Sequence, residues 1–303
     1  MNITIGLFGC GLWGQNILHD LLQLGCRVTV VEPNELNRRR AKALGAHDVV
    51  ASHARMSVVH GILVATPAST HATVVDQILD RGVPVFIEKP FTTDTQSAIR
   101  LAELAPDRLF VMHIWRYHPG VELLGAITRS EELGPVTMVR TVRTNWTSSR
   151  RDTDSIWTLV PHDLSIAAEI LGTIPAARFA VAEAMKEQPL GLIAILGDHP
   201  IFVLEVSNRY ADKRREIRVH CRDAVAVLPS GDANEVEITR ISHGELEPRT
   251  EKRRFSTEAP LRRELAAFVQ HLRGGPPPRS NAAEGLAVVR TVVQLRALAN
   301  LTT

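Results

Sequence analysis

The chain has 303 residues, of which 45% are hydrophobic and 22% charged, and its formal net charge is +2 at pH 7. This length suits two domains, and so small a charge gives no reason to expect nucleic acid or an anionic membrane as a partner. No apolar run reaches the ~20 residues of a membrane-spanning helix, and a strand that begins at residue 3 leaves no room for a signal peptide. The three cysteines, Cys10, Cys26 and Cys221, have no metal-binding spacing, so we expect a reduced cytoplasmic protein without a metal.

In the first third of the chain, predicted strands alternate with predicted helices. Strands are expected over residues 3–8, 27–32, 61–65, 84–87 and 109–112. Helices are expected between them, over residues 12–24, 35–44, 70–81 and 94–104. The strands do not alternate strictly between apolar and polar residues, a pattern typical of a parallel sheet covered on both faces. This order predicts a doubly wound parallel α/β sheet.

The first strand leads into Gly9-Cys10-Gly11-Leu12-Trp13-Gly14, which opens the first helix. In a Gly-x-Gly-x-x-Gly turn the first glycine allows the tight turn, the second lets a pyrophosphate approach the backbone, and the third permits close helix packing. The free N–H groups and positive dipole of the helix N-terminus favour phosphate. We therefore expect a Rossmann domain in which this turn binds a dinucleotide and Trp13 covers it.

The second predicted strand ends in Glu32, close to the expected ~20 residues beyond the last glycine. A carboxylate there accepts hydrogen bonds from both ribose hydroxyls of NAD and repels the 2′-phosphate of NADP. The arginines at residues 38–40 are able to neutralise a 2′-phosphate, although a solvated helix face is the simpler interpretation of that run. Glu32 therefore favours NAD over NADP as the cofactor.

The pattern changes near Pro119, where helices give way to successive strands. A helix is expected over residues 121–129, a long strand over 136–146 and a helix over 157–171. Further strands are expected over residues 178–185, 190–196, 201–210, 216–220, 224–228 and 235–241. Because turns and not helices join them, these strands predict an α+β domain with an open, mostly antiparallel sheet.

The end of the chain is predicted to be helical. Apolar residues recur there at the spacing of one helix face, namely Leu261, Leu265, Phe268, Val269 and Leu272. Three prolines at residues 276–278 indicate a linker, and Asn281 with Glu284 resembles a capping box for the last helix. We therefore divide the chain into a dinucleotide-binding domain, residues 1–118, and a substrate-binding and oligomerisation domain, residues 119–303.

Four further segments carry polar groups at the ends of predicted elements. Three follow strands of the first sheet: Ala65-Thr66-Pro67, with His71 in the next helix; Glu88-Lys89-Pro90; and His113 to Pro119, which includes Arg116 and Tyr117. The fourth is Val160-Pro161-His162-Asp163-Leu164, which opens a helix of the second domain. Ligands of doubly wound sheets bind outside the carboxyl ends of the strands, so the first three are expected beside the cofactor.

In this order, and with the terminal helices, these motifs resemble the glucose-fructose oxidoreductase and inositol dehydrogenase (Gfo/Idh/MocA) family over nearly the whole chain. The resemblance implies a Rossmann domain followed by an α/β domain whose open sheet makes oligomer contacts. It also implies hydride transfer between NAD(P) and a sugar, sugar nucleotide or polyol. The segment Pro161-His162-Asp163-Leu164-Ser165 is most similar to the branch that acts on nucleotide sugars, including UDP-N-acetylglucosamine 3-dehydrogenases.

Lys89 and His162 are the expected catalytic residues. A lysine beside a nicotinamide can donate a hydrogen bond to the reacting oxygen, and burial with the cofactor's positive ring lowers its pKa toward neutrality. The resemblance implies that a cis Lys89–Pro90 peptide aims this lysine. His162 titrates near neutral pH and can take the proton as hydride leaves the same carbon. The alternatives are a surface lysine at a strand end and a structural histidine.

One position departs from the family, which usually carries an aspartate four residues before this histidine, where this chain has Thr158. Threonine can hydrogen-bond a hydroxyl but is not a base near neutral pH. Either His162 and Lys89 suffice, or Asp154 or Asp163 takes over, or the activity is altered or lost. For Asp163 itself three roles stay open: orienting His162, binding a substrate hydroxyl, or favouring the helix N-terminus.

The remaining candidates are assigned through the resemblance. Those expected to bind the cofactor are Gly9, Gly11, Leu12, Trp13, Gly14, Glu32, Thr66, Pro67, His71, Glu88 and Lys89. Those expected to bind the substrate are Arg116, Tyr117, Thr158 and Asp163. A packed structural role is the alternative for His71, and a seal between domains for Arg116 and Tyr117. With a nucleotide sugar as substrate, arginines near Trp146 meet its diphosphate; an exposed loop is the alternative for Arg143, Arg150 and Arg151.

These observations predict an NAD-dependent oxidoreductase that moves hydride between nicotinamide and a secondary hydroxyl or ketone of a sugar, at C3 of a nucleotide sugar. One alternative is an inositol or free-monosaccharide dehydrogenase, which needs no phosphate contacts. An alternative of another class is a non-catalytic, NAD-binding regulatory protein. A homodimer or homotetramer is expected, because an open sheet face leaves apolar surface that a partner subunit can cover.

Overall fold

A computed structural model describes residues 2–147, 153–185, 188–240 and 248–301. The chain forms two compact units, Met1–Ile114 with Ala259–Val289, and Trp115–Glu258 with Arg290–Thr303. The assignment of cofactor binding to residues 1–118 and substrate binding to residues 119–303 stays a prediction. None of the described helices combines the length and apolar composition that crossing a membrane requires.

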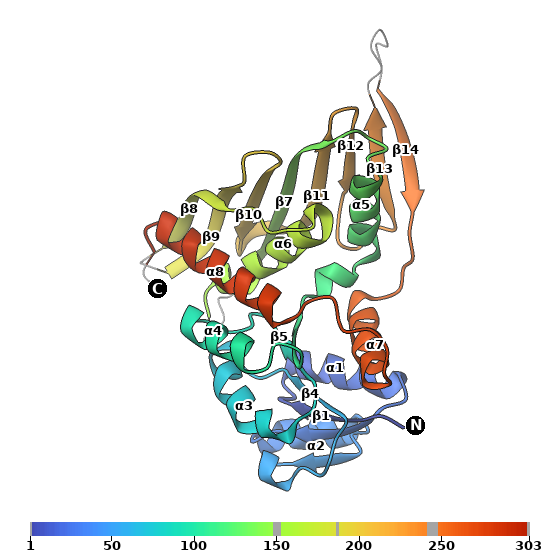
Figure 1. The fold of residues 1–303 in the computed structure, drawn as a ribbon, viewed down its shortest axis with the longest axis vertical. Helices are drawn as coiled ribbons and strands as arrows, with labels where there is room; N and C mark the ends of the chain where they lie inside the picture. Colours follow the sequence, from blue (N-terminus) through green and yellow to red (C-terminus); the bar gives the residue numbers. More distant parts are fainter. Residues whose placement is uncertain (1, 148–152, 186–187, 241–247, 302–303) are drawn as a thin grey trace. The chain divides into compact units, whose positions relative to one another are not determined.

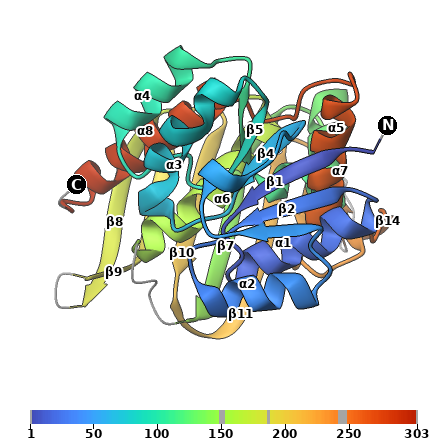
Figure 2. The same ribbon diagram turned by 90° about the horizontal axis from the view of Figure 1, so that it is seen from below.

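The first unit is built on a six-stranded parallel sheet in the order β3-β2-β1-β4-β5-β6 (Figure 1). Its strands are β1 (Thr4–Phe8), β2 (Arg27–Val31), β3 (Asp48–Val50), β4 (Gly61–Val64), β5 (Val85–Glu88) and β6 (Leu109–Met112). Figure 2 shows α1 (Leu12–Gln23) and α2 (Glu35–Ala43) on one face of this sheet, with α3 (His71–Ile78) and α4 (Thr95–Leu104) on the other. The predicted doubly wound parallel sheet is therefore confirmed. Short 3₁₀ turns complete the unit at His53–Arg55, Ala68–Thr70 and Leu79–Arg81.

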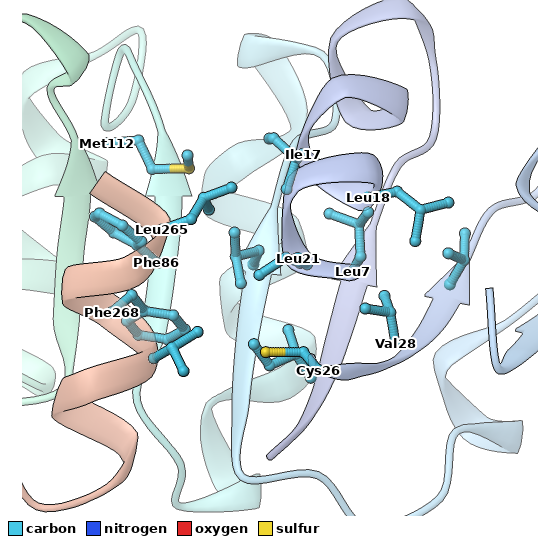
Figure 3. Packing of buried hydrophobic residues seen from close by; sticks show 14 of the residues in the cluster. Leu7, Ile17, Leu18, Leu21, Cys26, Val28, Phe86, Met112, Leu265 and Phe268 are labelled. Atoms are coloured by element: carbon cyan, nitrogen blue, oxygen red, sulfur yellow. The ribbon is translucent and has the colours of Figure 1, made fainter. Parts of the chain in front are cut away.

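Helix α7 (Pro260–Leu272) belongs to the first unit, although nearly the whole second unit precedes it in the sequence. Its Leu265 and Phe268 lie in the same buried cluster as Phe86 and Met112 of β5 and β6 (Figure 3). The Phe86 and Phe268 rings lie 5.0 Å apart between centroids. Burying such a side chain stabilises the fold by about 1.5–3 kcal/mol. Sequence periodicity predicted this helix face but not the sheet against which it packs.

The second unit is built on an eight-stranded sheet in the order β14-β13-β12-β11-β7-β10-β9-β8. Its strands are β7 (Val136–Trp146), β8 (Ala177–Met185), β9 (Gln188–Leu196), β10 (Ile201–Ser207), β11 (Arg209–Cys221), β12 (Ala224–Leu228), β13 (Glu235–Arg240) and β14 (Arg249–Arg254). The β7–β10 pair is parallel and the other described pairs are antiparallel. The predicted mostly antiparallel sheet is thus confirmed.

Helices cover one face of the eight-stranded sheet (Figure 1). They are α5 (Pro119–Ser130) and α6 (Ser155–Leu171), and a 3₁₀ turn over Ile114–Tyr117 precedes α5. The last helix, α8 (Ala282–Leu298), begins in the first unit and ends in the second. The segment predicted to open a helix lies inside α6 instead, because Asp154 caps that helix seven residues before Pro161.

One predicted strand ends earlier than expected, and two strands of the structure were not predicted. The strand predicted over residues 201–210 ends at Ser207, and the basic run at residues 213–215 belongs to β11. Strand β14, with the sequence Arg-Thr-Glu-Lys-Arg-Arg, was not predicted because so charged a segment resembles a solvated loop. Strand β3 was missed because it has only three residues. Of the strand predicted to end at Ile241, that last residue lies outside the described residues.

Candidate active site

The glycine-rich turn contains two glycines that the fold itself requires. Gly9 has φ = +86°, and a Cβ there would lie 2.6 Å from the Ala65 carbonyl oxygen. A Cβ at Gly14 would lie 2.3 Å from the Gly9 carbonyl oxygen, so Gly14 lets α1 close tightly onto the turn. Gly11 differs, because a Cβ there would meet no described atom within 4 Å and its φ is −66°. Packing of the described chain therefore does not require a glycine at position 11.

Helix α1 begins at this turn without a capping side chain. Gly11 is its N-cap, no side chain of the described residues bonds to that cap, and the first turn has no acidic residue. Leu12 is 84% exposed and Trp13 is also exposed. The first N–H groups of a helix lack intrahelical acceptors and carry the positive end of its dipole. This end of α1 is therefore able to bind an anion.

Glu32 follows β2 and forms hydrogen bonds with the loops that follow β1 and β2, at the carboxyl edge of the sheet. Its Oε2 accepts a hydrogen bond from the Cys10 amide at 2.8 Å, and its Oε1 accepts one from the Asn34 amide at 2.9 Å. Arg38 donates through Nη1 to the Glu32 carbonyl at 3.0 Å. Burial and the nearby Glu32 carboxylate together raise the pKa of the Cys10 thiol to about 11. The buried carboxylate is thus held in place beside the glycine-rich turn.

His71 joins the loops that follow β4 and β5. Its Nδ1 lies 2.8 Å from the Pro90 carbonyl oxygen and its Nε2 lies 3.0 Å from the Thr66 carbonyl oxygen. The Thr66 hydroxyl in turn accepts from the Thr70 hydroxyl at 2.9 Å. His71 is buried and Pro67 is exposed. The structure therefore shows His71 as a structural link, whatever its relation to the cofactor.

Glu88 connects the end of β5 to the start of α1. Its Oε1 accepts a hydrogen bond from the Trp13 indole nitrogen, and its Oε2 accepts one from the Lys89 amide at 3.0 Å. The Lys89–Pro90 peptide is cis, as predicted. Lys89 is half-buried. The structure thus brings the glycine-rich turn, Glu88 and Lys89 together at one edge of the parallel sheet.

In the second unit, helix α6 presents two residues away from the core. Fourteen of its residues are buried, and those that are not are Thr158, His162 and Leu171. Thr158 and His162 are four residues apart, one helical turn, so they share a face. The Thr158 hydroxyl donates to the Asp154 carbonyl at 2.9 Å. Thr158 is therefore on the same half-buried strip of α6 as His162, the expected catalytic histidine.

Both aspartates considered as substitute bases already have hydrogen-bonding partners. Asp154 caps α6 by accepting from the Ile156 and Trp157 amides, and its other oxygen accepts from Arg296. Asp163 is 1% exposed and forms an ion pair with Arg143, whose Nε lies 2.7 Å from its Oδ2. Both carboxylates stabilise the helix and its surroundings. The structure shows Asp163 paired with Arg143. It shows none of the three roles considered for Asp163: orienting His162, binding a substrate hydroxyl or favouring the helix N-terminus.

The other predicted substrate residues also have structural partners. Arg116 donates through Nε to Glu169 Oε2 at 3.1 Å, and Tyr117 is buried. Arg143 is buried, and its guanidinium lies 4.4 Å from the ring centre of Trp115. Trp146 is exposed, with Arg209 stacked on it. Arg150 and Arg151 lie outside the described residues.

Sequence reasoning missed a cluster around Trp115. His118 stacks on Trp115 with centroids 5.0 Å apart, accepts from the Gly120 amide through Nδ1, and donates through Nε2 to the Gly231 carbonyl. Arg215 donates to the Thr144 carbonyl at 2.8 Å, and burial together with nearby Arg143 lowers its pKa to about 10. These partners come from three distant strands and loops, so no local pattern announces them. Among the described residues, no group of three or more His, Cys, Asp or Glu side chains could hold a metal.

Residues 3–114 match the GFO_IDH_MocA family, described as an oxidoreductase family with an NAD-binding Rossmann fold. The Rossmann part of the chain therefore belongs to the Gfo/Idh/MocA family. It is 27% identical to inositol 2-dehydrogenase from Burkholderia vietnamiensis over 95% of this chain and 91% of that protein. It is 29% identical to UDP-N-acetylglucosamine 3-dehydrogenase from Acidithiobacillus ferrooxidans over 57% of this chain and 56% of that protein.

Two solved structures share the fold over nearly the whole chain. The UDP-N-acetylglucosamine 3-dehydrogenase from Acidithiobacillus ferrooxidans aligns with a TM-score of 0.84 at 24% identity, over 98% of both chains. Levoglucosan dehydrogenase, in complex with NADH and levoglucosan, aligns with a TM-score of 0.86 at 13% identity, over 99% of this chain and 98% of that chain. The first unit is thus that of an oxidoreductase family with an NAD-binding Rossmann fold.

Proposed function

We propose that the protein is an NAD-dependent oxidoreductase that oxidises a secondary hydroxyl of a sugar, at C3 of a nucleotide sugar. One observation carries this proposal most directly: the half-buried strip of α6 contains Thr158 and His162, while the rest of that helix up to Ile170 is buried. A hydroxyl and an imidazole on one half-buried strip suit a polyhydroxylated substrate, because each can exchange hydrogen bonds with a hydroxyl.

The residues of the first unit fit a bound dinucleotide. The N–H groups at the uncapped start of α1 suit a pyrophosphate, and glycine at position 11 permits its close approach. Glu32 adds a negative charge at the end of β2, which suits a ribose diol and disfavours a 2′-phosphate. We therefore assign NAD as the preferred cofactor. When bound, the nicotinamide supplies the hydride chemistry.

Lys89 and His162 are assigned the proton chemistry. Lys89 donates a hydrogen bond to the reacting oxygen and stabilises negative charge on it as the C–H bond breaks. His162 takes the hydroxyl proton on its imidazole. Because Asp154 and Asp163 are held by Arg296 and Arg143, we assign no base role to either. Of the alternatives raised by Thr158, we favour the one in which Lys89 and His162 suffice.

An inositol or free-monosaccharide dehydrogenase is the second candidate, favoured by two observations. The similarity to inositol 2-dehydrogenase covers 95% of this chain. Arg143, one of the arginines expected to meet a diphosphate, is buried against Asp163. Support for the nucleotide sugar comes from the Pro161-His162-Asp163 segment and from the similarity to a UDP-N-acetylglucosamine 3-dehydrogenase over 57% of the chain.

We also propose that the protein forms a homo-oligomer through β8 and β9. Exposed apolar side chains pair across these strands, with Phe179 opposite Ile195 and Val181 opposite Ile193. Their sequence neighbours Ala180, Leu192 and Ala194 are buried, so the exposed set forms one face. A second copy covers such a self-complementary strip. Ile193→Asp should dissociate the oligomer in sedimentation velocity, whereas Val58→Asp, at an exposed valine of the first unit, should not.

Turnover separates the two candidate functions. The purified protein with NAD is offered UDP-N-acetylglucosamine, UDP-glucose, N-acetylglucosamine and myo-inositol, and reduced nicotinamide is followed by absorbance. Activity with UDP-N-acetylglucosamine and not with the free sugar supports the nucleotide-sugar function. Activity with myo-inositol or free sugars, undiminished by the absence of a nucleotide, supports the second candidate and contradicts the first.

A further inference from the structure

A fully buried carboxyl group interrupts the apolar face of α7. Glu264 is 0% exposed and lies on the buried side of the helix with Leu261, Leu265 and Phe268. Neither of its carboxyl oxygens has a hydrogen-bond partner among the described residues. A buried, unsatisfied polar group costs a protein stability, so its presence in the core of the first unit needs an explanation.

The packing of α7 places Glu264 next to the end of β5. Phe268 stacks near Phe86 in the middle of β5, and a Cβ at Gly61, the first residue of parallel β4, would meet Leu272 and Phe268. The C-terminal half of α7 therefore lies near the starts of the strands and its N-terminal half near their ends (Figure 3). Four helical residues rise about 6 Å and two strand residues about 6.6 Å, so Glu264 comes level with Glu88.

Two glutamates that face each other in a low-dielectric core do not both stay ionised. Glu88 accepts hydrogen bonds from the Trp13 indole and the Lys89 amide, which favour its ionised form. Glu264 has no such donors among the described residues, and burial, followed by the Glu88 charge, raises its pKa well above the ordinary value. Glu264 is therefore the member of the pair that keeps its proton at neutral pH.

Other titratable groups around α7 do not change this assignment. His113 follows β6, whose last residue Met112 pairs with Glu88, and it is buried as well. On α1, which packs against α7, His19 and Asp20 lie outside the buried face. Lys89 follows Glu88 directly, so its side chain is the cation nearest to Glu88 in sequence. The charge of Glu88 acts on Glu264 in the same direction as burial does.

We propose that Glu264 is a positioning residue that, as a neutral carboxylic acid, donates its O–H to the Glu88 carboxylate and so fixes Trp13 and the Lys89 backbone. This inference rests on the proposed role of Lys89 in the oxidoreductase reaction. It adds a third donor to Glu88 and links α7 to the end of β5. The buried carboxyl group is then retained for the geometry of the site and not for the stability of the fold.

Two substitutions separate this role from a structural one. Glu264→Gln keeps a neutral hydrogen-bond donor of similar shape, and Glu264→Leu removes it. For Glu264→Leu we expect kcat to fall about ten- to hundredfold, because a displaced catalytic group loses rate steeply. We expect its melting temperature to stay within about 2–4 °C of wild type, since the lost hydrogen bond and the removed cost of burying a carboxyl group offset each other. Glu264→Gln should retain kcat within about threefold, and Gln270→Leu, at an exposed position of α7, should leave both quantities unchanged.

Infrared spectroscopy tests the protonation without any substrate. At pH 7 the wild type should show the carbonyl stretch of a protonated carboxylic acid, and Glu264→Gln should lack it. Loss of that band in Glu264→Gln supports the proposal even where turnover has not been found. The absence of the band from the wild type overturns it. Wild-type kcat in Glu264→Leu, or a loss of stability and activity together in both variants, also overturns it.

Discussion

The two units use the carboxylates near their candidate sites in different ways. In the first unit, Glu32 and Glu88 accept hydrogen bonds from N–H groups of the loops that follow β1, β2 and β5. In the second unit, Asp154 and Asp163 are paired with the arginines Arg296 and Arg143. The first arrangement holds the loops around the proposed cofactor site in position. The second holds α6 in position, and Thr158 and His162 are the residues of its candidate site that are not buried. Carboxylate groups thus support a binding turn in one unit and a helix in the other.

The largest effect is expected at Lys89 and His162, to which the proton chemistry is assigned. Lys89→Ala and His162→Ala should each lower turnover by roughly 10²–10⁴, the usual contribution of general acid–base catalysis. Steady-state rates with NAD and the substrate found in the panel measure this. Asp163→Asn is the comparison variant, because it should lower the free energy of unfolding more clearly than it lowers turnover. Turnover within twofold of wild type in both alanine variants would contradict the assigned mechanism.

The second effect concerns the ion pair of the second unit. Asp163→Ala leaves Arg143 as an uncompensated buried charge and should lower the free energy of unfolding by about 3–5 kcal/mol. Replacing both residues, as Asp163→Leu with Arg143→Met, should restore most of that loss. Urea denaturation of the single and double variants provides the measurement. If the single variant is as stable as wild type, the pair does not support α6.

The third prediction is that Gly9 and Gly11 of the glycine-rich turn respond differently to substitution by alanine. Gly9→Ala forces a side chain into a positive φ and against the Ala65 carbonyl, so it should lower the free energy of unfolding by about 1–3 kcal/mol or more. Gly11→Ala has neither problem and should fold with wild-type stability while binding NAD more weakly. Thermal melts and NAD titrations measure the two properties. A Gly11→Ala protein with unchanged NAD affinity would remove the reason to place the pyrophosphate at this turn.

The smallest effect is a pH dependence in the first unit. The pKa of Glu264 is raised in the folded protein, so the folded state keeps a proton that the unfolded chain releases above its ordinary pKa of 4.5. Its contribution to stability is therefore fully present below that pH and is lost as the pH rises toward the folded-state value. The stability of Glu264→Gln minus that of wild type should increase by up to about 1.4 kcal/mol per pH unit above 4.5.

Urea denaturation at pH 5, 6 and 7 measures that difference. The exposed Glu103 is the matched control, and Glu103→Gln should run parallel to wild type over the same range. If the Glu264→Gln curve is also parallel to wild type, the carboxyl group is not held in its protonated form. Glu264 of the first unit would then be ionised at neutral pH, and the contrast between the two units would be weaker.

The sequence predicted those parts of the site that are local. Gly9, Gly14 and Glu32 follow a motif whose spacing alone fixes a turn and a helix start, and the structure has both. The partners of Asp163 and Glu88 could not be predicted, because ion pairs and hydrogen bonds across 20 or 75 residues leave no periodic trace. Glu264 did leave one, a lone acid within a helical apolar face, and a search for such interruptions would have found it.

The most direct test of the account is the appearance of reduced nicotinamide when the purified protein and NAD meet a panel of nucleotide sugars, inositols and free hexoses. We expect reduction with a sugar of this panel, foremost UDP-N-acetylglucosamine, and its loss in Lys89→Ala and His162→Ala. No reduction with any of them, and no oxidation of NADH by the corresponding ketones, in a protein shown separately to bind NAD, would contradict a sugar oxidoreductase. Thr158 would then mark the loss of the activity.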